Sequence, residues 1–153
     1  SRVRFILTEP SHPGNVGSSA RAVKNMGFED LWLVAPKTTN MACDEQAIAL
    51  ASGATDILEN TQSTPTLEQA LAPITLSFAL TARARDLGPP PCDIREAAQL
   101  AREHLWTHAS HRVAIVLGSE RAGLTNTQIS LCHRICHIPA NPSYSSLNVA
   151  QAL

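Results

Sequence analysis

Three short segments of this chain carry small polar residues, at positions 14–21, 117–124 and 139–148, and the first two also contain glycine and arginine. Their side chains offer amides, hydroxyls and guanidinium groups, which bind and orient a ligand rather than attack it. The sequence has no GxSxG nucleophile motif, no Walker lysine and no carboxylate cluster suited to Mg²⁺. The pattern therefore favours a transferase that receives its reactive group on a cosubstrate, or a binding module.

The first segment, GNVGSSA at 14–20, has the setting of a dinucleotide-binding fingerprint but reads GxxGxxA rather than GxGxxG. The end of the second predicted strand, VAPK at 34–37, has no acid to bind a ribose, so a nicotinamide or flavin enzyme is disfavoured. Asn15 fits a helix N-cap and a site residue equally well. Arg21 is favoured as a ligand contact, because the residues around it are small enough for a polymer backbone to approach. These small residues are Ser18, Ser19, Ala20 and Ala22.

The length and composition fit one globular domain. The chain has 153 residues, of which 44% are hydrophobic and 16% charged, without a low-complexity tract or an internal repeat. The apolar run within residues 1–10 is too short for a signal peptide or a membrane span. We therefore expect a cytoplasmic protein.

Charge is unevenly distributed along the chain. The formal net charge of −1 gives no general basic surface. Residues 41–82 contain five acidic residues and no Lys or Arg, whereas arginines lie on both sides of this stretch. The segregation is compatible with a local phosphate-binding face and also with ordinary solvated charges.

The four cysteines are expected to remain free thiols in a reducing compartment. The segment CHRICH at 132–137 brings metal-ligand residue types together, but it lacks the paired spacing of structural zinc sites. If it is half helix end and half strand, its side chains point to different faces. Ordinary packing is therefore favoured over a metal site.

Apolar runs of strand length alternate with helical patterns along the chain. Near-continuous apolar strands separated by helices predict a parallel sheet covered by helices on both faces, an α/β fold. The runs lie at 3–8, 31–34, 74–80, 113–117 and 134–138, with a weaker one around 56–58.

Helix boundaries are marked by local signals. The pattern from Val16 to Met26 closes at Gly27, which suits a left-handed helix cap. Three further helix starts have capping-box spacing. These pairs are Thr66 with Gln69, Asp93 with Glu96, and Thr125 with Gln128.

Ligands of parallel sheets bind beyond the carboxyl ends of the strands. The loops that follow the predicted strands at this edge hold most of the chain's glycine and proline. We therefore expect the site there. The loops are 9–15, 81–91, 118–124 and 139–144.

Taken together, the three polar segments resemble the SPOUT class of methyltransferases, in its TrmH-type branch, and most closely its members that methylate ribose 2′-hydroxyls of tRNA. The matching stretches are PSHPGNVGSSAR at 10–21, LGSERAGL at 117–124 and IPANPSYSSLN at 138–148, in the family's order. The resemblance implies a single SPOUT domain over residues 1–153 that lacks the end of its last helix and any C-terminal extension. It also implies a deep C-terminal trefoil knot, formed by the segment from about Gly118 onward.

The resemblance further implies S-adenosylmethionine as the cofactor, held in the knot mostly by backbone groups. Its implied contacts are Leu80, Thr81, Ala82, Gly118, Ile138, Ser145, Ser146, Leu147 and Asn148. The implied catalytic residues are Arg21, Asn15, Glu120 and Ser146. The candidates for RNA contact are Arg21, Arg83, Arg85 and Arg121, with a solvent-exposed loop as the alternative for Arg83 and Arg85.

Two positions depart from the family pattern. Leu80 stands where a hydroxyl residue is common, and Ser119 stands where an arginine is common, which removes one expected phosphate contact. The implied reaction is methyl transfer to an RNA 2′-hydroxyl, most closely at nucleotide 32 of the tRNA anticodon loop. The implied assembly is a homodimer that uses the first and final helices. An rRNA 2′-O-methyltransferase and a catalytically inactive RNA-binding module remain alternatives.

Overall fold

The computed structural model describes residues 2–82, 88–119 and 122–138. Within them, seven parallel strands form one sheet in the order β3-β2-β1-β6-β4-β7-β5. The strands are β1 (Val3–Thr8), β2 (Asp30–Val34), β3 (Gln62–Thr64), β4 (Leu76–Thr81), β5 (Pro91–Cys92), β6 (Val113–Leu117) and β7 (Arg134–His137). The helices are α1 (Pro13–Asn25), α2 (Glu45–Ala51), α3 (Thr55–Glu59), α4 (Leu67–Leu71), α5 (Ile94–Thr107) and α6 (Asn126–Ser130), with 3₁₀ turns η1 (Met41–Cys43) and η2 (Ser52–Ala54).

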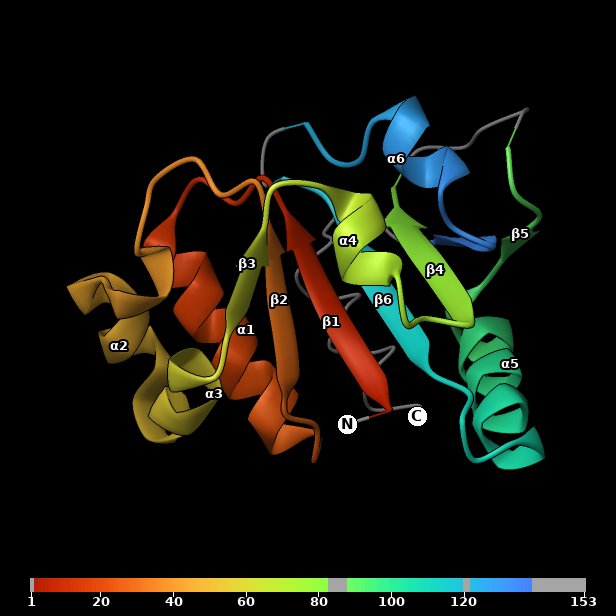
Figure 1. The fold of residues 1–153 in the computed structure, drawn as a ribbon, viewed down its shortest axis with the longest axis horizontal. Helices are drawn as coiled ribbons and strands as arrows, with labels where there is room; N and C mark the ends of the chain where they lie inside the picture. The colour runs from red at the N-terminus through yellow and green to blue at the C-terminus, as the bar shows by residue number, and fades with distance from the viewer. Residues whose placement is uncertain (1, 83–87, 120–121, 139–153) are drawn as a thin grey trace.

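Helices cover both faces of the sheet, with α4 in front of it and α1 behind it in Figure 1. On the face behind, α1, α2 and α5 pack against a larger core that includes Phe5, Phe78 and Ile115. On the face in front, α4 and α6 pack against a smaller core around Ile6 and Val116. All six residues of β1 are buried, as expected for a parallel strand covered on both sides. The predicted α/β architecture is confirmed.

Five of the predicted strands are present. Those at 3–8 and 113–117 have the predicted bounds, and those at 31–34, 74–80 and 134–138 have shifted ends.

No helix in the described part of the chain is long and apolar enough to cross a membrane.

The weak strand predicted around 56–58 is wrong, because these residues lie in α3. Ile57 and Leu58 are buried in the larger core as part of a short helix, and so short an apolar run does not distinguish helix from strand. The strand of this region is β3, whose residues are polar and partly exposed at the edge of the sheet. The two-residue strand β5, at the opposite edge, gave no signal in the sequence.

The predicted helix ends are largely confirmed. Gly27 has φ +85°, the left-handed conformation that glycine adopts without a steric cost. The capping boxes at Asp93 and Thr125 are complete. Thr66 makes only half of its box: its hydroxyl accepts from the backbone N–H of Gln69, while the Gln69 side chain contacts that hydroxyl instead of the backbone.

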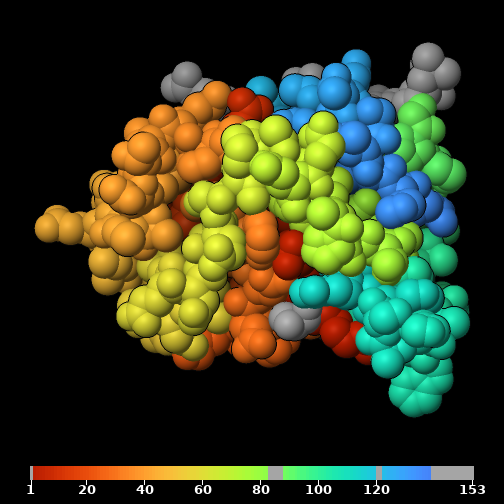
Figure 2. All heavy atoms as spheres, in the orientation of Figure 1, coloured from red at the N-terminus to blue at the C-terminus, as the bar shows by residue number. Residues whose placement is uncertain are grey.

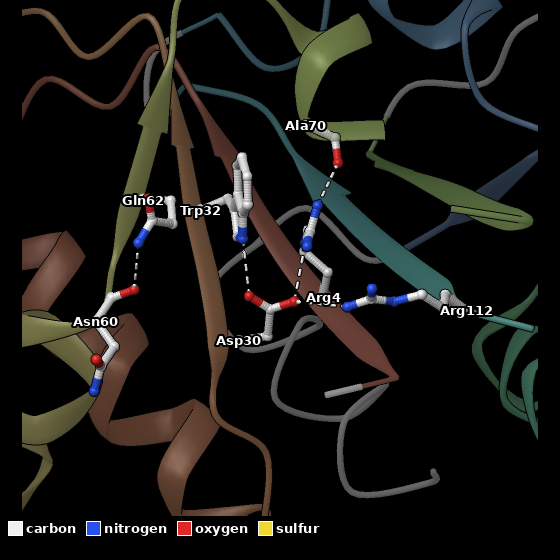
Figure 3. Close-up of polar contacts among 7 residues, drawn as sticks. All are labelled: Arg4, Asp30, Trp32, Asn60, Gln62, Ala70 and Arg112. Carbon is white, nitrogen blue, oxygen red and sulfur yellow. Dashed lines mark hydrogen bonds and ion pairs between the residues drawn. The ribbon is translucent and has the colours of Figure 1, made fainter. Parts of the chain in front are cut away.

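A buried charge network ties the amino ends of the central strands together (Figure 3). The Arg4 guanidinium, only 7% exposed, pairs with Asp30 at 2.9 Å and donates to the carbonyl of Ala70 in α4. It also lies 4.0 Å from the ring centre of Trp32, whose indole N–H donates to Asp30. Arg112, before β6, approaches the same carboxylate at 3.8 Å. The network therefore joins β1, β2, α4 and the start of β6.

This network lines a hollow of about 410 Å³ on the α4 face. Figure 2 shows the hollow below α4, between the yellow segment that contains α3 and the teal segment around the start of β6. It lies toward the amino ends of the strands, whereas the predicted site lies at their carboxyl ends.

Replacement of Asp30 by Ala tests the network, because it leaves the buried Arg4 guanidinium without its anionic partner. We expect the free energy of unfolding to fall by about 3 kcal/mol, measured by urea denaturation. Lys24→Ala, which removes a pair between side chains that are 46% and 57% exposed, is the matched control and should leave the midpoint unchanged. Equal effects of the two variants would contradict a stabilising role for the buried pair.

Candidate active site

The carboxyl ends of three neighbouring strands gather the predicted cofactor residues that the structure describes. β4 lies between β6 and β7, so the residues that follow these strands, Ala82, Gly118 and Ile138, belong to adjacent strand ends. The N–H of Ile138 donates to the carbonyl of Thr81 at 3.0 Å, which extends the β4–β7 pairing beyond the strand. Leu80, Thr81 and Ile138 are buried, and Ala82 is exposed. The edge thus offers buried apolar side chains together with backbone groups where the sheet pairing ends.

The loop after β6 folds back on itself. The backbone N–H of Gly123 donates to the carbonyl of Ser119 at 3.0 Å, and Gly123 has φ +68°. A Cβ on Gly118 would lie 2.1 Å from the backbone carbon of Gly123 and 2.3 Å from the nitrogen of Leu124. Gly118 is therefore required by close contact within the loop itself, in addition to any approach of a ligand.

Helix α1 begins at the same edge of the sheet. Its N-cap is His12, and Asn15 is the third residue of the helix, so the interpretation of Asn15 as the N-cap is wrong. Asn15, Ser18 and Arg21 are exposed and recur every third residue, which places them along one strip of the helix surface. Val16, Ala20 and Val23, on the opposite side, are buried. The amphipathic pattern of α1 therefore presents the predicted catalytic side chains to solvent.

The glycines of α1 serve helix packing. A Cβ on Gly17 would lie 2.1 Å from the carbonyl oxygen of Ala47 in α2, and a Cβ on Gly14 would lie 2.9 Å from a methyl group of Leu50. The GxxGxxA pattern is thus explained by the close approach of α2, which agrees with the absence of the other dinucleotide-binding signals.

Thr8 and Glu9 were not predicted as individual site residues, although Glu9 lies in the predicted loop 9–15, and they connect the end of β1 to β6 and to α6. The Thr8 hydroxyl donates to the carbonyl of Leu117 at 2.9 Å, and Gln128 of α6 donates to the Glu9 carboxylate at 3.3 Å. Glu9 also has φ +48°, a rare conformation for a residue other than glycine. The available signal was the position of both residues, at the end of β1 directly before the first motif.

Several predicted residues lie outside the part of the chain that the structure describes, so their placement stays a prediction. They are Arg83, Arg85, Glu120, Arg121, Ser145, Ser146, Leu147 and Asn148.

The cysteine and histidine segment after α6 is accounted for by packing. Cys132 belongs to the smaller core and Cys136 to the larger one, so their side chains point to opposite faces of the sheet, as predicted. Burial raises the pKa of the Cys132 thiol to about 11. The Cys136 pKa is raised by its hydrogen bond with Cys92 and by burial, and the Cys92 pKa is lowered by the same hydrogen bond. In residues 2–82, 88–119 and 122–138, no group of three or more His, Cys, Asp or Glu side chains is placed to hold a metal ion.

Comparisons with protein families and with curated proteins both find RNA methyltransferases as relatives of this chain. A family model described as the SpoU rRNA methylase family matches residues 2–153. Among curated proteins, the tRNA (cytidine/uridine-2′-O-)-methyltransferase TrmJ of Cronobacter sakazakii is 48% identical over 151 residues, which cover 99% of this chain and 59% of that protein. The chain therefore spans about three fifths of the length of the curated relatives it matches.

Solved structures agree with this result. A probable methyltransferase from Bordetella pertussis Tohama I is 65% identical, with a TM-score of 0.91 over 100% of this chain and 94% of that one. TrmJ from Z. mobilis ZM4 is 36% identical, with a TM-score of 0.80 over 99% and 65% of the two chains. At 16% identity, the SpoU methyltransferase AviRb from Streptomyces viridochromogenes in complex with AdoMet shares the fold, with a TM-score of 0.69 over 97% and 57%.

The variant Gly118→Ala tests the folded-back loop. Its methyl group would meet backbone atoms that cannot move independently, so we expect a loss of about 1–3 kcal/mol in the free energy of unfolding. The matched control is Gly53→Ala, because a Cβ at Gly53 meets no atom within 4 Å. Thermal unfolding of both variants provides the measurement, and equal midpoints would contradict the steric requirement at Gly118.

Proposed function

This chain belongs to the SpoU rRNA methylase family, and on that premise we propose that it transfers the methyl group of S-adenosylmethionine to a ribose 2′-hydroxyl of tRNA. The observation that carries the proposal is the grouping of Ala82, Gly118 and Ile138 at adjacent strand ends, beside the start of α1. The identity of nearly half over the whole chain to a curated tRNA 2′-O-methyltransferase supports the same assignment.

The residues at this edge fit the proposed cofactor. Buried Leu80, Thr81 and Ile138 supply apolar surface and backbone groups for a ligand that has both an adenine ring and a polar amino-acid end. An AdoMet complex of the same fold, AviRb, supports this choice. Ala82 and Gly118 would complete the contacts, together with Ser145, Ser146, Leu147 and Asn148 from the third segment. When bound, the cofactor supplies an electrophilic methyl group on its sulfonium.

The chain's own contribution to the reaction would be alignment and charge stabilisation. Methyl transfer is an in-line displacement, and alignment of two reacting groups can lower the barrier by roughly 7–11 kcal/mol. Arg21 would hold an RNA phosphate and stabilise the negative charge on the 2′-oxygen as the hydroxyl proton passes to solvent water, which reaches this exposed face of α1. We do not assign it the role of general base, because a guanidinium group stays protonated in proteins. Asn15, Glu120 and Ser146 would shape the site around the hydroxyl.

The proposed RNA contacts are Arg21 of α1 together with Arg83, Arg85 and Arg121, and the acidic side chains of the stretch 41–82 would face away from the RNA. We further propose the family's deep knot for the chain from about Gly118 onward, and a homodimer formed through the first and final helices. Among tRNA positions, nucleotide 32 of the anticodon loop is the proposed target.

A second candidate, methylation of rRNA, is favoured by the description of the matching family model. A catalytically inactive RNA-binding module is the third. Incubation of the protein with methyl-labelled S-adenosylmethionine and separate tRNA and rRNA pools, followed by mapping of the modified nucleotide, distinguishes the three. We expect label in tRNA. Label in rRNA alone would support the second candidate, and cofactor binding without label in either pool would support the third.

Arg21→Ala tests the proposed clamp. We expect the turnover number to fall about a hundredfold, because one preorganised charge near the developing oxyanion is lost, while the affinity for S-adenosylmethionine in calorimetry stays unchanged. Arg102→Ala removes an exposed arginine from α5 and should keep full activity. Full turnover of the Arg21 variant with intact cofactor binding would contradict a role for Arg21 in the reaction.

A further inference from the structure

We propose that Glu9 and Gln128 form a strut that sets the position of the loop leading into α1 relative to the glycine loop that leads into α6. The strut is the hydrogen bond from the Gln128 side-chain amide to the Glu9 carboxylate. Both are positioning residues, and the inference rests on the proposed function, because α1 carries Arg21, which is proposed for RNA binding, and the glycine loop begins at Gly118, which is proposed for cofactor binding.

Hydrogen bonds to the end of β2 and to the loop that follows it hold the backbone around Glu9 in its unusual conformation. Glu9 follows β1 directly, with φ +48°, and its N–H donates to the carbonyl of Val34 at the end of β2. Lys37, after β2, donates its N–H to the carbonyl of Pro10 at 3.0 Å. Strained residues of this kind persist only where their surroundings fix them, and they concentrate at functional sites. The conformation turns the chain sharply away from β1 toward α1.

The Glu9 side chain is held between two elements. One carboxylate oxygen accepts from the Lys37 ammonium at 3.2 Å, and the other accepts from the Gln128 side-chain amide at 3.3 Å. The carboxylate is therefore anchored to the loop after β2 and to helix α6 at the same time.

The orientation of the Gln128 amide is fixed by the cap of α6. Its side-chain oxygen accepts from the backbone N–H of Thr125 at 2.8 Å, which completes the capping box. The amide NH₂ group must then point away from the cap, where it meets Glu9. A glutamate would cap α6 equally well, but it would place a second carboxylate against Glu9. Glutamine at this position therefore satisfies the cap and the strut together.

The strut connects elements that cover opposite faces of the sheet. Helix α6 packs on the smaller core through Ile129, and α1 packs on the larger core through Val16. Between them, the Thr8 hydroxyl holds the carbonyl of Leu117, directly before Gly118. The strut and this bond together fix the start of the first motif relative to the second. Displacement of about 1 Å between reacting groups can cost about a hundredfold in rate, so the geometry at this edge bears on methyl transfer.

Single substitutions of Glu9 and Gln128, and then their exchange in a double variant, test the strut. Gln128→Glu keeps the cap of α6 and sets two carboxylates against each other, so we expect the single-turnover rate of tRNA methylation to fall at least about tenfold. The affinity for S-adenosylhomocysteine, measured by calorimetry, should change less than about threefold, because the substitution leaves the proposed contacts at the ends of β4 and β7 in place. The single-turnover rate of the Glu9→Gln variant, which loses only the charge, should fall less than that of Gln128→Glu.

The double variant Glu9→Gln with Gln128→Glu restores a donor opposite an acceptor. This double variant should recover the rate to within about threefold of the wild type. If each substitution only disturbed its own surroundings, the two losses would add and the double variant would be slower than either single variant. The matched control is Gln69→Glu, which makes the same change at the equivalent cap position of α4 and should keep the wild-type rate.

The outcomes separate the two proposals. A wild-type protein that methylates no RNA would overturn the proposed function and the strut with it. An active wild type whose Gln128→Glu rate is unchanged, or whose double variant is no faster than the Gln128→Glu variant, would overturn the strut alone.

Discussion

Parallel pairing of β4 with β6 on one side and with β7 on the other is the constraint on which the rest of this molecule depends. These strands are separated by tens of residues in the chain, yet their carboxyl ends are adjacent in the sheet. Parallel strands place their following loops at one edge, so Ala82, Gly118 and Ile138 meet there. Every residue proposed for cofactor binding within the described part of the chain depends on this pairing.

The two ends of the sheet are stabilised by different kinds of interaction, a buried ion pair at one end and single hydrogen bonds at the other. At the amino ends, a guanidinium that is almost fully buried is neutralised by Asp30 and stacked on Trp32, which fixes β1 against β2. At the carboxyl ends, the contacts are single hydrogen bonds from Thr8, Gln128 and Lys37, around backbone in a left-handed conformation. The proposed site therefore lies at the edge that is held by hydrogen bonds from exposed and partly buried side chains, away from the buried charge network.

The glycines of this protein show how a motif and its physical cause can differ. Gly14 and Gly17 look like a nucleotide-binding pattern, but they allow α2 to approach α1, and Gly118 allows the following loop to fold back on its own strand. Close packing of backbone against backbone is a sufficient reason for each. Such packing positions the site without contact to a ligand, and it gives the GxxGxxA pattern a cause other than nucleotide binding.

The sequence by itself determined the α/β class, five strands, the closing glycine of α1 and two complete capping boxes, because these depend on local periodicity and on hydrogen bonds between near neighbours. Its motifs also identified the family that the comparisons confirm. Only the tertiary structure decided the strand order, the helical state of 55–59, the position of Asn15 inside α1 and the contacts of Glu9. The strand order and the contacts of Glu9 depend on partners distant in the chain, and local propensity does not encode which distant segments will pack together. The apolar run in 55–59 is too short to distinguish helix from strand, and Asn15 fits more than one position at a helix start.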